Sequence, residues 1–247
     1  MESARRQQVY DLLLMPIVCD DRNRKKIERL DGSICTGQKY TSPYIDEDMS
    51  DYAVGFYEIV YRTLLGNHSL LDEKGNIIDR EFSGDTMNSF ETTANRTPGA
   101  GKRKAVRTPE SEWPDFLRIY KHRYHCLANF WILPMETGRS SGGELNKMQR
   151  ASDYMDRYLN VLHEEVRFNG QEREYHNRFT SWDNFLDRHF LRSGYLDDNA
   201  IISISRGTAE EFTKCAIKAM EGRAKDISES EYAGLLWKYF DRNGLLK

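Results

Sequence analysis

The sequence predicts a mainly α protein with a minor β component. Three observations lead to this class: apolar residues recur every three or four positions over long segments after residue 112, helix-capping signals precede two segments, and strand-like alternation is rare. Helices with one apolar face bury that face against other elements. We therefore expect a helical domain over residues 112–247, with an irregular α/β region, residues 1–111, packed on it as part of one compact unit.

The N-terminal region contains few regular patterns. Helices are predicted over residues 4–14 and 46–65, and Gly66 is expected to end the second. Residues 20–43 are charged and then rich in Gly, Ser and Thr, which is compatible with a short hairpin. Residues 95–109 contain two prolines and two glycines and are predicted to form a loop.

Helical periodicity dominates the remainder of the chain. It covers residues 115–133, 144–166 and 172–191, although residues 130–133 are equally compatible with a strand. The tetrapeptides TAEE (208–211) and SESE (228–231) match the capping box and predict two more helices. Gly222 and Gly244 are expected to follow the last turns of those helices.

The composition excludes several classes of protein. Lys and Arg number 36 against 39 Asp and Glu, so the chain is not generally polybasic, but a local basic patch remains open. Aromatic residues make up 12%, which is too rich for a disordered chain. No apolar run approaches the ~18 residues of a membrane span, and no secretory signal is evident, so we expect a cytoplasmic protein without a membrane partner. The four cysteines lie at least 16 residues apart, which predicts reduced thiols rather than a zinc site.

The first candidate site is a polar stripe. If residues 115–133 are helical, then Arg118, His122, His125 and Asn129 recur at spacings of four, three and four and share one face. Histidine can act as a general acid or base and arginine can stabilise phosphorane charge, so Arg118 with His125 also matches a ribonuclease-like pair. A histidine pair can hold a metal, but no third ligand is fixed by the sequence. The alternative interpretation is a solvated polar face.

The second candidate site is the segment FSGDTMNSF, residues 82–90. A Gly-Asp-Thr turn between two Phe anchors can hold a divalent metal through Asp85 or bind a phosphate through backbone N–H groups. The alternative is a capped turn whose polar side chains bond to local amides.

The third candidate site is a basic loop. Arg96, Lys102, Arg103, Lys104 and Arg107 supply five positive charges without an acidic residue between positions 95 and 109. The loop lacks the spacer and the Ser/Thr of a nucleotide-binding P-loop. A loop that grips phosphates by charge and a purely solvated loop both remain open.

Two resemblances to known families add to these patterns. Residues 125–134, HCLANFWILP, followed by LNK at 145–147, resemble the H-x-x-G-N-L-x-L-L…L-N element of some HNH (His-Me finger) nucleases. In that element the Asn ends a β-hairpin, but the acidic-His pair that supplies the nuclease base has no counterpart near Asp85. The order FSGDTMNSF, HCLANFWILP and YHNRFTSWDNFLDRHFL resembles an uncharacterised family of bacterial and phage proteins, which implies no established activity.

Taken together, these patterns predict a protein that binds or acts on nucleic acid, a nucleotide or another phosphate-bearing ligand. A nuclease-like enzyme, with Asp85 joining the stripe and a divalent metal as cofactor, is one form of this hypothesis. The alternative is a non-catalytic protein, an inhibitor or a subunit of a larger assembly, that binds a protein partner.

Overall fold

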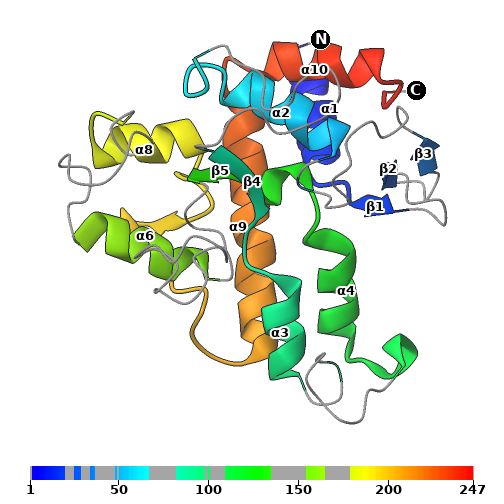
Figure 1. The fold of residues 1–247 in the computed structure, drawn as a ribbon, viewed down its shortest axis with the longest axis vertical. Helices are drawn as coiled ribbons and strands as arrows, with labels where there is room; N and C mark the ends of the chain where they lie inside the picture. The colour runs from blue at the N-terminus through cyan, green and yellow to red at the C-terminus, as the bar shows by residue number, and fades with distance from the viewer. Residues whose placement is uncertain are drawn as a thin grey trace.

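The computed structural model describes residues 2–19, 25–28, 34–36, 48, 50–66, 82–97, 100, 109–134, 154–164 and 179–246. Within these ranges the protein is mainly α with a minor β component, as the sequence predicts (Figure 1). The α-helices are α1 (Glu2–Leu13), α2 (Asp51–Val60), α3 (Phe90–Arg96), α4 (Asp115–Arg123), α6 (Met155–Glu164), α8 (Trp182–His189), α9 (Ala209–Glu229) and α10 (Ala233–Arg242). Two 3₁₀ turns, η2 (Glu110–Glu112) and η3 (Leu127–Asn129), flank α4.

The strands form three small antiparallel sheets. One sheet has the order β1 (Ile17–Cys19), β2 (Lys25–Glu28), β3 (Ile34–Thr36), and β2 with β3 is the hairpin expected within residues 20–43. A second sheet pairs β4 (Phe82–Thr86) with β5 (Phe130–Pro134), and β6 (Leu196–Asp197) pairs with β7 (Ala200–Ile201). The β4–β5 ribbon joins the two predicted regions, because one of its strands comes from each.

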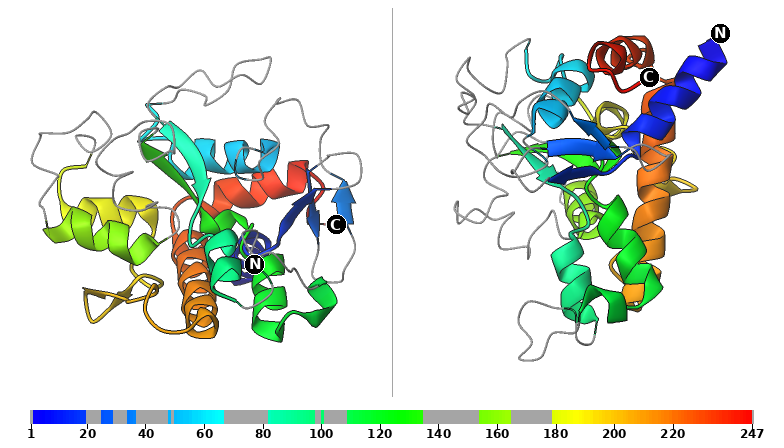
Figure 2. Two further views of the ribbon diagram at one scale, coloured as in Figure 1. Left: turned by 60° about the horizontal axis from the view of Figure 1, so that its bottom comes forward. Right: turned by 90° about the vertical axis from the view of Figure 1, so that its right-hand side faces the viewer.

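Helix α9 is the central element of the fold. Figure 1 shows it running vertically, with α3 and α4 beside its lower half and α1, α2 and α10 gathered at its upper end. The right-hand view of Figure 2 shows α1 lying against the same end of α9. One large apolar cluster contains residues from α1, α2, β5, α6, α8, α9 and α10. The predicted apolar stripes supply much of this core, including Tyr120, Leu159, Leu186, Phe212 and Phe240.

The N-terminal boundaries differ slightly from the predictions. Helix α1 covers nearly all of predicted residues 4–14 and begins at Glu2. Helix α2 is shorter than predicted: Ser50 caps it by accepting from the Ala53 N–H, and it ends at Val60. Turns then continue to Gly66, whose φ of 62° permits the change of direction expected there. Of predicted helices 144–166 and 172–191, the described parts contain α6 and α8.

The two capping predictions have opposite outcomes. At the start of α9, Thr208 Oγ1 accepts from the Glu211 N–H and the Glu211 carboxylate accepts from the Thr208 N–H, so the capping box is confirmed. The box at 228–231 is wrong, because Ser228 lies inside α9 and donates to the Lys225 carbonyl. Helix α10 begins only at Ala233, and Gly244, at φ 72°, follows its end as predicted.

Gly222 does not end a helix, contrary to the prediction. It lies in the middle of α9, which continues to Glu229. A Cβ at position 222 would overlap the backbone of Gly194 and of Ser193, and the same holds in reverse for Gly194 against Ala219. The glycine is therefore required by the close approach of the segment after α8, which Asp226 also holds by accepting from the Ser193 N–H at 2.8 Å.

The predicted helix over residues 115–133 is also wrong in its second half. Helix α4 ends at Arg123, and the chain then turns through η3 into strand β5. The reason is tertiary: the His125 carbonyl accepts from the Ile17 N–H at 2.7 Å, and Cys126 forms a bridge with Pro16. These partners come from a distant part of the chain and draw the backbone out of the helix, which selects the strand alternative for residues 130–133.

The glycine contact predicts unequal effects of two Gly-to-Ala substitutions. Gly222→Ala should lower the free energy of unfolding by about 1–3 kcal/mol, because the new methyl group meets backbone atoms that cannot rotate away. Gly234→Ala in α10 is the matched control, since nothing lies within 4 Å of its Cβ position, and it should be neutral or stabilising by up to ~1 kcal/mol. Urea unfolding of both variants measures the difference. Equal stabilities for the two would contradict the packing described here.

Candidate functional site

Asn129, one of the predicted catalytic residues, is a buried structural clamp. Its side chain is fully buried, and its Nδ2 donates at 2.7 Å to both the Met87 and the Tyr124 carbonyl oxygens. Its backbone carbonyl also accepts from the Met87 N–H at 3.0 Å. These bonds hold the end of α4 to the chain just after β4, and an inaccessible amide cannot contact a substrate.

His122 and Arg118 lie on the exposed side of α4. His122 has a side chain that is 64% exposed, and its Nε2 is 3.8 Å from Glu110 Oε1. Arg118 forms an ion pair with Asp115, one turn earlier in the same helix. Neither contact places these side chains in an enclosed pocket, so the described geometry matches a solvated face as well as it matches a site.

His125 lies between these extremes. It is half-buried and follows α4, so it does not share a helical face with Arg118 and His122. Its ring stacks on Tyr124 at 3.7 Å between centroids, which is the orienting contact that the neighbouring Tyr was expected to provide. A second ring, Phe130, lies at 6.2 Å. The single-stripe prediction is therefore wrong, because the helix ends before His125.

Segment 82–90 begins as a strand and not as the predicted turn. Asp85 lies in β4, where its Oδ1 accepts from the Thr86 N–H at 2.8 Å. Thr86 in turn donates its hydroxyl to Asp48 Oδ2 at 2.9 Å, so a second carboxylate, which no sequence pattern indicated, lies at the same end of the ribbon. The local bond at Asp85 matches the alternative of polar groups bonding to nearby amides.

The basic residues are described only in part. Arg96 ends α3, where its guanidinium donates to the Gly207 carbonyl and lies 5.6 Å from the Phe212 ring. Lys102, Arg103, Lys104 and Arg107 lie outside the described residues. Arg96 is thus partly committed to the contact between α3 and the start of α9.

The most connected buried polar group is Arg223, to which no sequence motif pointed. It is fully buried in α9, and all three guanidinium nitrogens donate. The acceptors are the carbonyl oxygens of His189 (2.9 Å), Ala128 (2.7 Å) and Phe130 (2.8 Å) and the hydroxyl of Tyr61 (2.8 Å).

Aromatic rings enclose this arginine. Its Cζ lies 5.1 Å from the Trp131 ring, and Trp131 stacks on the buried imidazole of His189 at 5.1 Å. The Tyr61 hydroxyl is 3.0 Å from His189 Nδ1. Within the described part of the chain no ion pair joins Arg223 to a carboxylate, so carbonyl oxygens and ring faces accommodate its charge. With no access to solvent, this centre is structural.

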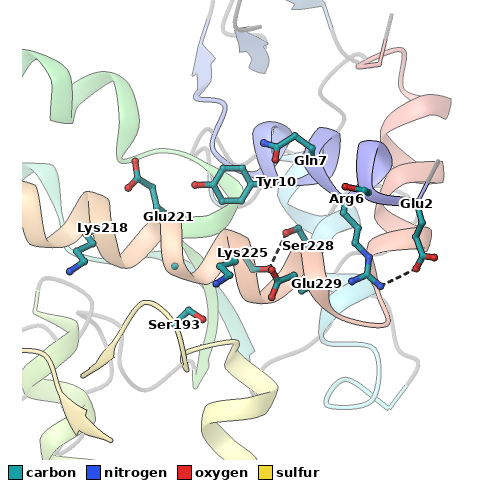
Figure 3. Close-up of a pocket in the computed structure, with 12 residues that line it drawn as sticks. Glu2, Arg6, Gln7, Tyr10, Ser193, Lys218, Glu221, Lys225, Ser228 and Glu229 are labelled. Atoms are coloured by element: carbon teal, nitrogen blue, oxygen red, sulfur yellow. Dashed lines mark hydrogen bonds and ion pairs between the residues drawn. The ribbon is translucent and has the colours of Figure 1, made fainter. Parts of the chain in front are cut away.

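The largest groove lies elsewhere, between α1 and α9. Figure 3 shows Tyr10 and Gln7 from α1 facing Lys218, Glu221 and Lys225 from α9, in a groove of about 1190 Å³. Three cationic and three acidic side chains line it, so neither charge sign is in excess. None of the predicted site residues lines this groove, and its mixed charge gives no preference for a phosphate.

Cysteine chemistry gives no candidate centre in the described residues. Cys126 is buried, and burial raises the pKa of its thiol to about 12, so it is protonated at neutral pH. It contacts Met220 in the core, as expected of a small apolar residue. No group of three or more His, Cys, Asp or Glu side chains that could hold a metal occurs within the ranges that the structure describes.

We found no match to this chain among protein-family models, curated proteins or solved structures. The resemblances noted from the sequence therefore remain resemblances. Over the described parts of the chain, no helix combines the length and the apolar character needed to cross a membrane.

These positions predict opposite behaviour for two residues of the proposed stripe. Asn129→Ala should lower the free energy of unfolding by about 2–4 kcal/mol, because two buried carbonyl oxygens lose their donor. His122→Ala should change it by less than ~0.5 kcal/mol, as is usual for an exposed side chain. Thermal and urea unfolding of both variants provide the measurement. An Asn129→Ala variant of normal stability would restore Asn129 as a functional candidate.

Proposed function

We propose that this protein binds nucleic acid or another phosphate-bearing ligand and that the basic segment between α3 and η2 supplies the phosphate contacts. The single observation that carries the proposal is the run of five cations without an acidic residue between positions 95 and 109. Such a run attracts polyanions by charge, independently of sequence. An overall net charge of −3 makes this local excess the clearest anion-binding feature of the chain.

The described ends of this segment support the proposal, because both belong to one packed group of helices. On the α3 side, Arg96 is bonded to the Gly207 carbonyl next to the start of α9. On the other side, Lys121 of α4 forms an ion pair with Glu110 of η2 and lies 5.5 Å from the Trp113 ring. Helices α3, α4 and α9 contact one another. The basic residues are thus tethered a few residues from a rigid support.

The proposal is for binding, because the described residues favour catalysis less. Asn129 is enclosed, and Arg118 and His122 form ion pairs or close charge contacts with acidic neighbours. Among the predicted catalytic residues, half-buried His125, stacked on Tyr124, keeps the best position for acid–base chemistry. Hydrolysis of a bound nucleic acid would extend the proposal to a nuclease-like enzyme.

Charge neutralisation tests the proposal. Replacing Lys102, Arg103 and Lys104 by Gln should weaken duplex DNA binding. It should also reduce the slope of log K against log salt by about 0.9 for each cation that contacts a phosphate. Fluorescence anisotropy with a labelled duplex at several salt concentrations measures both quantities.

The matched control neutralises three exposed cations in or next to α2 and α10, at the opposite end of the molecule from α3: Arg62, Lys238 and Arg242. This variant should leave the slope unchanged. No measurable binding of DNA, RNA or heparin by the wild-type protein would overturn the proposal and favour the protein-binding alternative. Equal losses in the two triple variants would show that net charge, and not this segment, drives binding.

A further inference from the structure

We propose that Asp48 and Asp85, together with Thr86 and Tyr57, form a binding site for a hard divalent cation such as Mg²⁺ or Ca²⁺ at the end of strand β4. The site is independent of the proposed phosphate binding, because it uses none of the basic residues. Three observations carry it: the placement of two carboxylates, a buried hydroxyl that no described residue satisfies, and a donor set made of oxygen alone.

The two carboxylates meet at Thr86. The Thr86 hydroxyl donates to Asp48 Oδ2 at 2.9 Å, and the Thr86 N–H donates to Asp85 Oδ1 at 2.8 Å. Asp48 precedes α2 in the sequence and Asp85 lies in β4, so the fold brings together two acids that are far apart along the chain. Both residues are half-buried, where water screens their charges less than at an open surface.

The Tyr57 hydroxyl is the independent sign of a ligand. Tyr57 is fully buried, and its hydroxyl has no hydrogen-bond partner among the described residues. A Cβ built on Gly84 would lie 2.7 Å from this hydroxyl and 2.6 Å from the Asp48 carbonyl oxygen, so both oxygens converge on Gly84, next to Asp85. Burial first, and then nearby negative charge that includes Asp48 and Asp85, raises the pKa of Tyr57 well above its usual value.

A buried hydroxyl that lies among carboxylates and makes no hydrogen bond is unfavourable unless something else occupies its lone pairs. A cation, or a water bound to that cation, would satisfy the hydroxyl and neutralise the two carboxylates at once. Gly84 keeps this space open, because any side chain there would collide with both oxygens.

The donor set defines the class of cation. Carboxylate, hydroxyl and carbonyl oxygens suit Mg²⁺ and Ca²⁺, whereas zinc and copper favour sulfur or imidazole ligands. Two carboxylates with neutral oxygens and bound waters are a common Mg²⁺ arrangement. Because Asp48 lies just before α2 and Asp85 in β4, a bound cation would fasten the start of that helix to the ribbon.

The experiment titrates the full-length protein with MgCl₂ or CaCl₂ by isothermal calorimetry and records the thermal transition with and without each salt. We expect one cation per chain and a higher transition temperature when it is bound. Asp48→Asn and Asp85→Asn should each weaken binding by at least about 10-fold, the loss that even outer-shell partners of a metal produce. The control Asp197→Asn/Asp198→Asn removes two exposed carboxylates and should bind as the wild type does.

Terbium luminescence gives a second measurement that does not depend on stability. Tb³⁺ replaces hard cations, and nearby aromatic rings sensitise its emission, so Tyr57→Phe should retain sensitised emission while Asp48→Asn/Asp85→Asn should lose it. Each variant is first checked for a cooperative thermal transition without metal. No heat and no shift with either cation, or wild-type binding by a folded Asp48→Asn/Asp85→Asn variant, would overturn the proposal.

Discussion

The structure depends on one buried guanidinium. Arg223, near the middle of α9, donates to carbonyl oxygens at the end of α8, in η3 and at the start of β5, and to the hydroxyl of Tyr61 just after α2. Each of these carbonyls lies where regular structure ends and a backbone acceptor would otherwise lack a partner. One side chain therefore joins four chain segments around a single helix, and the close contact of Gly222 with Gly194 brings α9 near enough for it to do so.

This arrangement explains why the most polar sequence motif is largely structural. The segment HCLANFWILP supplies two of the carbonyls that Arg223 requires, the Asn129 amide that holds α4 to the residue after β4, and the Trp131 ring that covers the guanidinium. Its polar residues thus organise the β4–β5 ribbon. The ribbon in turn presents Asp85 and Thr86 to Asp48, so the candidate cation site lies at the edge of the same framework.

Local signals in the sequence predicted what depends on local physics. The apolar stripes, the capping box of Thr208 with Glu211 and the C-terminal Gly244 were predictable because their partners lie within one or two helical turns. The end of α4 at Arg123 was not, because Ile17 and Met87 determine it from distant parts of the chain. Gly222 suggested a helix end, whereas the structure uses it for a backbone contact. The burial of Arg223 and the approach of Asp48 to Asp85 leave no local signal, because they exist only after the chain has folded.

Replacing Arg223 by lysine shows whether one guanidinium holds these segments together. A lysine keeps the charge but cannot direct donors to three carbonyls and a hydroxyl at once, so the free energy of unfolding in urea should fall by about 3–5 kcal/mol, as when a buried charged network is broken. The same chemical change at exposed Arg206 should cost less than ~0.5 kcal/mol. A loss at position 223 as small as that at position 206 would contradict the role of Arg223 described here.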